Sequence, residues 1–162
     1  MRVSDLQAVQ LMTRSDLLNP PRKLPDLALP DAREGTSVRL RTSGDRSVLI
    51  VMIHPDCSDC AAWVEKLAGQ KDEIGSWKGE VRLVDRGAAG RPHPFQRLLD
   101  SDDQLGQALG VAAPAVVIAD QWGEIHEAAE AGEEHRFLPI ESAVEWIRHL
   151  ATSCPECEGE AF

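Results

Sequence analysis

The sequence has 162 residues, about the length of one domain, and 43% of them are hydrophobic while 27% are charged. This balance predicts a folded protein and argues against disorder. The net charge of −10 argues against nucleic acid as a partner, because binding to phosphates needs a basic surface. The longest apolar run, residues 48–53, is too short to cross a bilayer, so no membrane association is expected.

The first 23 residues are predicted to form an extension of the main domain. A possible capping box at Ser4 and Gln7 precedes a short amphipathic helix near 5–12, and the two prolines after Asn19 end it. This helix docks on the main domain or forms a dimer contact or a lid. The extension lacks the apolar stretch of a secretory signal, which favours the cytoplasm. Structural disulfides are rare there, and a CxxC motif is more often catalytic or metal-binding.

Residues 24–151 alternate between strand and helix patterns. The β-branched run 48–53 predicts a strand buried on both faces of a sheet, and helical spacing follows it from Cys60 onward. The predicted strands are 36–41, 48–53, 81–84, 115–118 and 124–128, and the predicted helices are 61–68, 105–109 and 140–151. Parallel strands joined by crossover helices, with a final antiparallel hairpin, predict an α/β sandwich. Residues 152–162 form a short acidic C-terminal tail.

Four cysteines form two CxxC motifs, Cys57 with Cys60 and Cys154 with Cys157. Cys57 lies where the buried strand leads into a helix, and helix N-termini offer unpaired N–H groups and the positive end of the dipole. Both stabilise a thiolate, so Cys57 is predicted to be the attacking nucleophile. Cys60, one turn further on, is predicted to resolve the mixed disulfide by exchange. The alternative is an inert, buried pair of thiols.

In its surroundings, the first motif resembles the site of the redoxin group of the thioredoxin-like superfamily, which includes bacterial thiol–disulfide oxidoreductases and peroxiredoxins. The resemblance covers about 24–151. The matching stretches are residues 24–31, the strand 48–53, the site 54–60, and 109–118 with the turn 120–123. The buried strand, the CxxC and the later proline occur in the order that this family shows.

The resemblance implies a thioredoxin-like three-layer α/β sandwich with a mixed central sheet. It implies a protein thiol–disulfide oxidoreductase in which Pro114 follows a cis peptide bond beside the sulfurs, while the Ala113 backbone pairs with an extended substrate. Such a protein carries electrons on its redox-active disulfide, needs no other cofactor and exchanges with a protein dithiol or disulfide partner.

The site departs from the family pattern in three places. Thioredoxins carry a buried acid in the strand before the motif, and 48–53 has none, so that role is vacant or falls to His54, Asp56 or Glu65. Asp56 also replaces the tryptophan that is common before the first cysteine. The Asp59 carboxylate is expected to raise the pKa of the nearby thiol by like-charge repulsion, and a protonated His54 would oppose this effect. We therefore expect a reducing rather than an oxidising couple.

Two other functions stay open. Peroxiredoxins of this group place a Thr or Ser hydroxyl three residues before the peroxidatic cysteine, where His54 stands, so a thiol peroxidase is the weaker alternative. The other is a non-enzymatic thioredoxin-like module that binds zinc through cysteines, because four thiolates can hold the ion tetrahedrally. The two CxxC pairs, however, lie far beyond the roughly 15–20 residues that separate the pairs of a zinc ribbon.

The second pair, Cys154 and Cys157, follows the last predicted helix. In a thioredoxin-like topology this helix starts near the active-site end and leads away from it for roughly 20 Å, so the tail is expected far from Cys57 of the same chain. Three interpretations stay open. The pair is a redox relay to another chain, in keeping with a possible homodimer, or a pair of metal ligands, or part of a non-functional tail.

The other polar and aromatic residues that could attract attention do not form a motif. His93 is expected in a loop between two prolines, and the scattered histidines are expected to be solvated: His126, His135 and His149. The tryptophans are expected to pack in the core or at its rim, with a substrate groove as the alternative for Trp77 and Trp122. The stretch 87–90 lacks the Gly-Lys-Ser/Thr ending of a phosphate loop.

Overall fold

A five-stranded mixed sheet lies at the centre of the protein, whose computed structural model describes residues 22–41, 44–87 and 94–153. The strands are arranged in the order β5-β4-β3-β6-β7. β3 is parallel to β4 and antiparallel to β6, β4 is parallel to β5, and β6 is antiparallel to β7. Their bounds are β3 (Ser47–Met52), β4 (Gly79–Asp85), β5 (Gln96–Leu99), β6 (Ala115–Ala119) and β7 (Ile125–Glu130).

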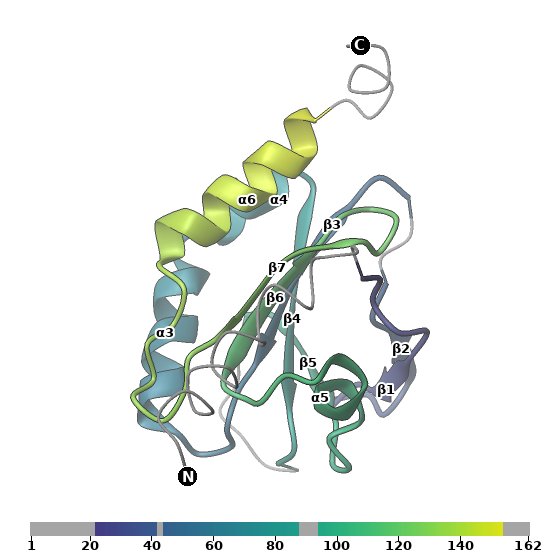
Figure 1. Cartoon of the computed structure of the whole chain (residues 1–162), viewed down its shortest axis with the longest axis vertical. Coiled ribbons are helices and arrows are strands. Elements are labelled where there is room, and N and C mark those ends of the chain that lie inside the picture. Colours follow the sequence, from purple (N-terminus) through teal and green to yellow (C-terminus); the bar gives the residue numbers. More distant parts are fainter. Residues whose placement is uncertain (1–21, 42–43, 88–93, 154–162) are drawn as a thin grey trace, which may run out of the picture.

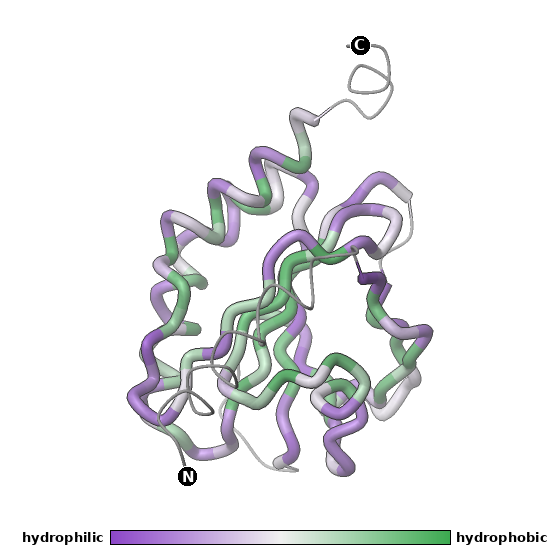
Figure 2. Tube along the Cα trace, in the orientation of Figure 1, coloured by the Kyte–Doolittle hydropathy of each residue, from purple (hydrophilic) through white to green (hydrophobic). Residues whose placement is uncertain are grey.

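The central strand β3 is buried on both faces, as its apolar run predicts. Successive side chains of a strand point to opposite faces of the sheet. Val48, Ile50 and Met52 therefore pack in one hydrophobic core, and Leu49 and Val51 pack in another. No residue from 48 to 53 is more than 6% exposed. Figure 2 shows this concentration of hydrophobic residues along the middle of the molecule.

Three helices cover one face of the sheet: α3 (Ser58–Ala68), α4 (Lys71–Ser76) and α6 (Ile140–Thr152). Their apolar sides, including Leu67, Ile74 and Ile147, join the core beneath them. The short helix α5 (Gln104–Leu109) covers the other face, together with a two-stranded antiparallel sheet of β1 (Ala28–Pro30) and β2 (Ser37–Arg39). Figure 1 shows the three layers side by side. This is the α/β sandwich with a mixed central sheet that the resemblance implies.

The expected elements of the central sheet and its main helices are present, but three elements are additions. β1, α4 and β5 have no strong pattern of their own in the sequence. β5 forms because it pairs with β4 in parallel register, and of its four residues only Leu98 is fully buried. α4 has six residues and buries only Ile74. Such short elements depend on their neighbours rather than on local periodicity.

The terminal predictions fall mostly outside the described residues. The expected helix near 5–12 and the motif Cys154–Cys157 both lie there. At the start of the described residues, the Arg22 carbonyl accepts a hydrogen bond from the N–H of Ile125, and Lys23 forms an antiparallel β-bridge with Glu124. Within the described ranges, no helix combines the length and the apolar composition that crossing a membrane requires.

Candidate redox site

The first CxxC motif lies at the carboxyl end of β3, where the chain turns into α3. The turn passes through Asp56, which has a φ of 55°, and Cys57 is the N-cap residue of the helix. The Cys57 carbonyl accepts the first helical hydrogen bond, from the N–H of Ala61 at 3.0 Å. Cys57 is half-buried, while Cys60, one turn into the helix, is 1% exposed. Both cysteines are free thiols in the structure.

The pKa of Cys57 lies below that of an ordinary thiol. Partial burial acts against the thiolate, but several hydrogen bonds outweigh it. They come from the backbone N–H and the thiol of Cys60, the backbone N–H of Asp59 and the side chain of His135. Helix N-termini stabilise an anion in this way through their unpaired N–H groups. Cys57 is therefore the thiol that ionises first.

Cys60 has the opposite character. Burial raises the pKa of its thiol to about 12, although the backbone N–H of His54 partly stabilises the thiolate. The hydrogen bond and the charge of Cys57, and the charge of Asp59, raise this pKa further. At neutral pH the pair thus consists of one ionisable, partly accessible sulfur and one protected, protonated sulfur. This is the division of roles expected of an attacking and a resolving thiol.

Asp59 acts on the two thiols in different ways. Its negative charge raises the pKa of Cys60, as like-charge repulsion on a nearby thiol predicts, and also that of His135. Asp59 is the second residue of α3, so its backbone N–H donates toward Cys57 and favours that thiolate. This hydrogen bond is one of those that lower the pKa of Cys57.

His135 is a member of the site that sequence reasoning missed. It was expected to be solvated, but its Nε2 lies 3.4 Å from the Cys57 Sγ. Its Nδ1 lies 2.9 Å from the carbonyl oxygen of Glu133, and this hydrogen bond raises the pKa of the imidazole. The Cys57 sulfur raises this pKa as well, whereas partial desolvation lowers it. The residue lies in the loop between β7 and α6, 78 positions from Cys57. No local motif signals such a distant contact.

His54 links the CxxC motif to the segment that contains Pro114. The Ala113–Pro114 peptide bond is cis, and Pro114 directly precedes β6, the antiparallel neighbour of β3. The Ala113 carbonyl oxygen lies 3.1 Å from His54 Nε2. The rings of His54 and His135 meet edge to face, with centroids 5.5 Å apart and planes inclined by 72°. The two histidines thus contact each other beside the dithiol, and they come from opposite sides of the motif in the sequence.

Comparison with known proteins gives further evidence on the fold. No protein-family model and no curated protein matches the sequence. Solved structures do match, at 16–19% identity. The structure assigned to the thiol:disulfide interchange protein DsbE of Chlorobium tepidum is 19% identical over 82% of this chain and 97% of its own, with a TM-score of 0.66. AhpC of Mycobacterium tuberculosis is 16% identical over 85% and 96%, also with a TM-score of 0.66.

A third match is the exposed lipoprotein thioredoxin Etrx1 of Streptococcus pneumoniae. It is 18% identical over 78% of this chain and 100% of its own, with a TM-score of 0.62. These likenesses, with the strand order and the three layers, decide the architecture. The chain has a thioredoxin-like fold. At such identities the likeness is one of fold.

Helix α6 leads away from the dithiol toward the opposite end of the sheet. α6 has 13 residues and is therefore about 20 Å long. Ile140, at its start, lines the same cavity as Asp59, whereas Ser153, after its end, lines a cavity with Asp45 at the other end of the sheet. The four residues from Ser153 to Cys157 span at most about 14 Å. The tail motif itself lies outside the described residues, and its distance from Cys57 of the same chain stays a prediction.

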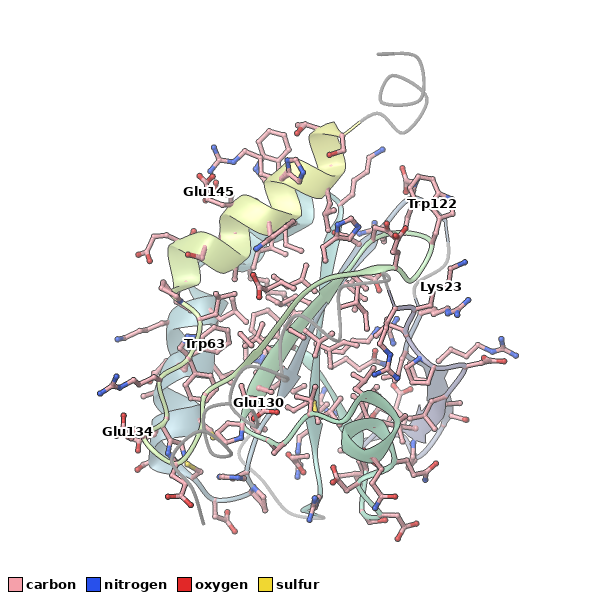
Figure 3. All side chains as sticks on the ribbon, in the orientation of Figure 1. Lys23, Trp63, Trp122, Glu130, Glu134 and Glu145 are labelled. Atoms are coloured by element: carbon pink, nitrogen blue, oxygen red, sulfur yellow. The ribbon has the colours of Figure 1, made fainter. Side chains whose placement is uncertain are left out.

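A cavity of about 420 Å³ adjoins the dithiol and is lined in part by Asp59, Trp63 and His135. Trp63 stacks on Phe137 with ring centroids 5.1 Å apart, and its indole N–H donates to the carbonyl of Leu138 at 3.0 Å. The two tryptophans considered for a groove, Trp77 and Trp122, line a different cavity. Figure 3 shows Trp122 at the end of the molecule opposite Glu134, the neighbour of His135. Trp63 is thus the tryptophan beside the redox site.

Proposed function

We propose that the protein is a thiol–disulfide oxidoreductase that uses the Cys57–Cys60 dithiol to reduce disulfides of protein substrates. The observation that carries the proposal is the unequal pair of thiols at the start of α3, with the pKa of Cys57 lowered and that of Cys60 raised to about 12. Oxidoreductases share the fold, which supports redox chemistry in general.

In the first step the Cys57 thiolate attacks one sulfur of the substrate disulfide. A bond forms between Cys57 and that sulfur, the substrate S–S bond breaks, and the departing sulfur leaves as a thiolate that takes up a proton. His135, whose Nε2 lies 3.4 Å from the Cys57 Sγ, is positioned to supply this proton as an imidazolium. We assign it the role of a general acid beside the nucleophile.

In the second step Cys60 loses its proton and attacks the Cys57 sulfur of the mixed disulfide. The second substrate thiol leaves, and the protein keeps the two-electron oxidised form as a Cys57–Cys60 disulfide. The imidazole of His135, neutral after the first step, is the nearby base for the Cys60 proton, because its ligand atom and both sulfurs lie within 4.8 Å of one another. A protein dithiol partner then reduces the disulfide, and no other cofactor takes part.

The substrate is proposed to lie along Ala113 and Pro114, where the cis bond precedes β6. An extended substrate chain would pair there with the Ala113 backbone. His54, which is hydrogen-bonded to the Ala113 carbonyl, and Asp56, in the turn before Cys57, are proposed to tune the dithiol. A reducing compartment such as the cytoplasm suits a dithiol of this kind, and the redox state of the pair in cell fractions tests that placement.

Reduction of insulin disulfides, with dithiothreitol as electron donor, tests the proposal. We expect turnover in the parent and in Cys154→Ser/Cys157→Ser, and none in Cys57→Ser. Cys60→Ser should accumulate a mixed disulfide, and mass spectrometry of that adduct identifies the natural partner. Equal turnover in the parent and in Cys57→Ser would refute the proposal.

A thiol peroxidase is the second candidate, because peroxiredoxins have the same fold. In that reaction Cys57 is oxidised by peroxide to a sulfenic acid, and Cys60 condenses with it to give the disulfide and water. Hydrogen peroxide consumption in the same assay separates the two. Rapid peroxide turnover that depends on Cys57, with slow insulin reduction, would make the peroxidase the main activity.

The tail pair Cys154 and Cys157 is proposed to act as a relay between chains. Ser153, the last residue described before the pair, lies at the end of α6 away from the dithiol, which supports exchange with another chain rather than with Cys57 of the same chain. A homodimer would supply the second chain. If turnover with the natural partner falls in Cys154→Ser/Cys157→Ser while insulin reduction does not, the relay is supported. Unchanged turnover in both assays would contradict it.

A further inference from the structure

Four potential metal ligands surround the attacking sulfur, and we call them the His2Cys2 cluster: His54, Cys57, Cys60 and His135. Two imidazole nitrogens and two sulfurs, one from each residue, all lie within 4.8 Å of one another. The first three ligands follow at intervals of three residues around the start of α3. The fourth comes from the loop before α6, so only the folded chain assembles the set.

Both histidines are held by backbone carbonyls through one ring nitrogen. His135 Nδ1 lies 2.9 Å from the oxygen of Glu133, and His54 Nε2 lies 3.1 Å from the oxygen of Ala113. A carbonyl oxygen only accepts, so in each neutral ring these nitrogens carry the proton. The other nitrogen then offers a lone pair, and in His135 this is the Nε2 that faces Cys57. Metal-bound histidines are almost always oriented by such a hydrogen bond.

The spacing of the cluster suits a tetrahedral ion. With Zn–S near 2.3 Å and Zn–N near 2.0–2.1 Å, neighbouring ligand atoms in a tetrahedral zinc site lie roughly 3.3–3.8 Å apart. The Cys57 Sγ and His135 Nε2 already lie 3.4 Å apart. The other pairs have to approach by at most about 1.5 Å from the 4.8 Å limit to reach the tetrahedral spacing. His54 is exposed, so its approach to the ion does not disturb the core.

The donor set also selects the kind of metal. Two thiolates and two neutral imidazoles are soft and borderline donors, which favour zinc over magnesium or calcium. Their two negative charges balance the charge of Zn²⁺, so the complex places no net charge beside the buried Cys60. This match of charge, donor type and spacing does not depend on the second CxxC.

We propose that the reduced protein binds one zinc ion at the His2Cys2 cluster, with all four coordination positions filled by this chain. A site without an open position is structural or regulatory rather than hydrolytic. The inference does not require the proposed disulfide exchange. It does place the metal and a substrate disulfide in competition for the same two sulfurs, so zinc would act as an inhibitor of the oxidoreductase.

The balance of this competition is simple. Zinc binding displaces one proton from each thiol and forms two Zn–S bonds. A substrate disulfide that accepts the two electrons of the dithiol and takes up two protons becomes two thiols. At the same time the Cys57–Cys60 bond forms, and the zinc is released. Zinc thus keeps the dithiol reduced and inactive, and oxidation discharges the metal.

Metal titration of the reduced chain in the Cys154→Ser/Cys157→Ser background tests the proposal without interference from the tail. Zinc is titrated against a chromophoric chelator, and cobalt(II) serves as the spectroscopic probe of thiolate and tetrahedral coordination. We expect one zinc per chain. His54→Ala and His135→Ala should each weaken binding at least tenfold and change the cobalt spectrum. His149→Ala is the matched control, because His149 lies in the last turn of α6 and belongs to neither group of potential ligands among the described residues, and it should bind as the parent does.

Three results would overturn the metal site: no zinc binding by the reduced background protein, equal affinity in the His54→Ala/His135→Ala double variant, or retained zinc in Cys57→Ser/Cys60→Ser. Circular dichroism establishes that each variant is folded. Insulin reduction in excess chelator is the independent measurement. A protein that reduces insulin without binding zinc refutes the metal site alone, and one that binds zinc without reducing insulin refutes the proposed function alone.

Discussion

Gly79 opens β4 at the place where α4 and α6 meet the sheet, and it leaves no room for a side chain. A Cβ built there lies 2.7 Å from the Cγ2 of Ile147, 2.8 Å from the Cγ2 of Ile74 and 3.1 Å from the Ile74 carbonyl oxygen. Carbon atoms in contact are normally about 3.5–4.0 Å apart. Ile74 and Ile147 are 1% and 0% exposed, so neither has free space to move into. Gly79→Ala should therefore destabilise the fold by about 1–3 kcal/mol, the usual cost of overpacking.

Gly75→Ala is the matched control, four residues away in α4. A Cβ at Gly75 meets nothing within 4 Å, and alanine favours the helix more than glycine does. This variant should be more stable than the parent by about 0.5–1 kcal/mol. Urea unfolding followed by circular dichroism measures both changes. Gly79→Ala should also melt roughly 2–12 °C lower, since about 2–4 °C corresponds to 1 kcal/mol in a chain of this size.

A second-site change tests the cause. Ile147→Leu removes the Cγ2 that the new methyl would meet, because leucine branches one carbon further out. Gly79→Ala/Ile147→Leu should therefore be more stable than the sum of the two single changes predicts. A Gly79→Ala protein as stable as the parent, or strict additivity in the double variant, would refute the steric argument.

Three further predictions concern the dithiol in reduced, chelator-treated protein. His135→Ala removes a hydrogen bond that lowers the pKa of Cys57. Iodoacetamide should therefore alkylate Cys57 of this variant more slowly than Cys57 of the parent near pH 7, and the two rates should become equal above about pH 10. An unchanged rate at pH 7 would contradict this. The folded Cys60 thiol has a pKa of about 12, above the roughly 8.5 of an unfolded thiol, so its contribution to stability is complete below about pH 8.5 and is lost as the pH rises. The parent should thus lose more stability in urea than Cys60→Ala as the pH rises above about 8.5, and parallel profiles would count against the buried thiol. Asp59→Asn removes a charge that raises the pKa of Cys60. In a Cys57→Ser background this substitution should speed the alkylation of Cys60 at fixed pH. Equal rates with and without it would show that the charge has no effect.

The central sheet and the dithiol were predictable because their signals are local. The run 48–53 is long enough to show that the strand is buried on both faces, and a CxxC at the strand-to-helix junction places Cys57 at a helix N-terminus. Of the two effects of Asp59, only one was predictable. Its charge, which raises the pKa of Cys60, is visible in the sequence, but the direction of its backbone N–H toward Cys57 exists only once α3 has formed.

By itself, the sequence determined that the chain forms an α/β sandwich and that Cys57 and Cys60 begin a helix after a buried strand, since both follow from side-chain periodicity and the spacing of neighbouring residues. Only the tertiary structure decided what stands around the sulfurs. His135 reaches Cys57 from 78 positions away because β6 and β7 return the chain to the same end of the sheet, and His54 meets Ala113 because β3 and β6 are antiparallel neighbours. Contacts between distant segments depend on strand order and register, which no local pattern of residues specifies.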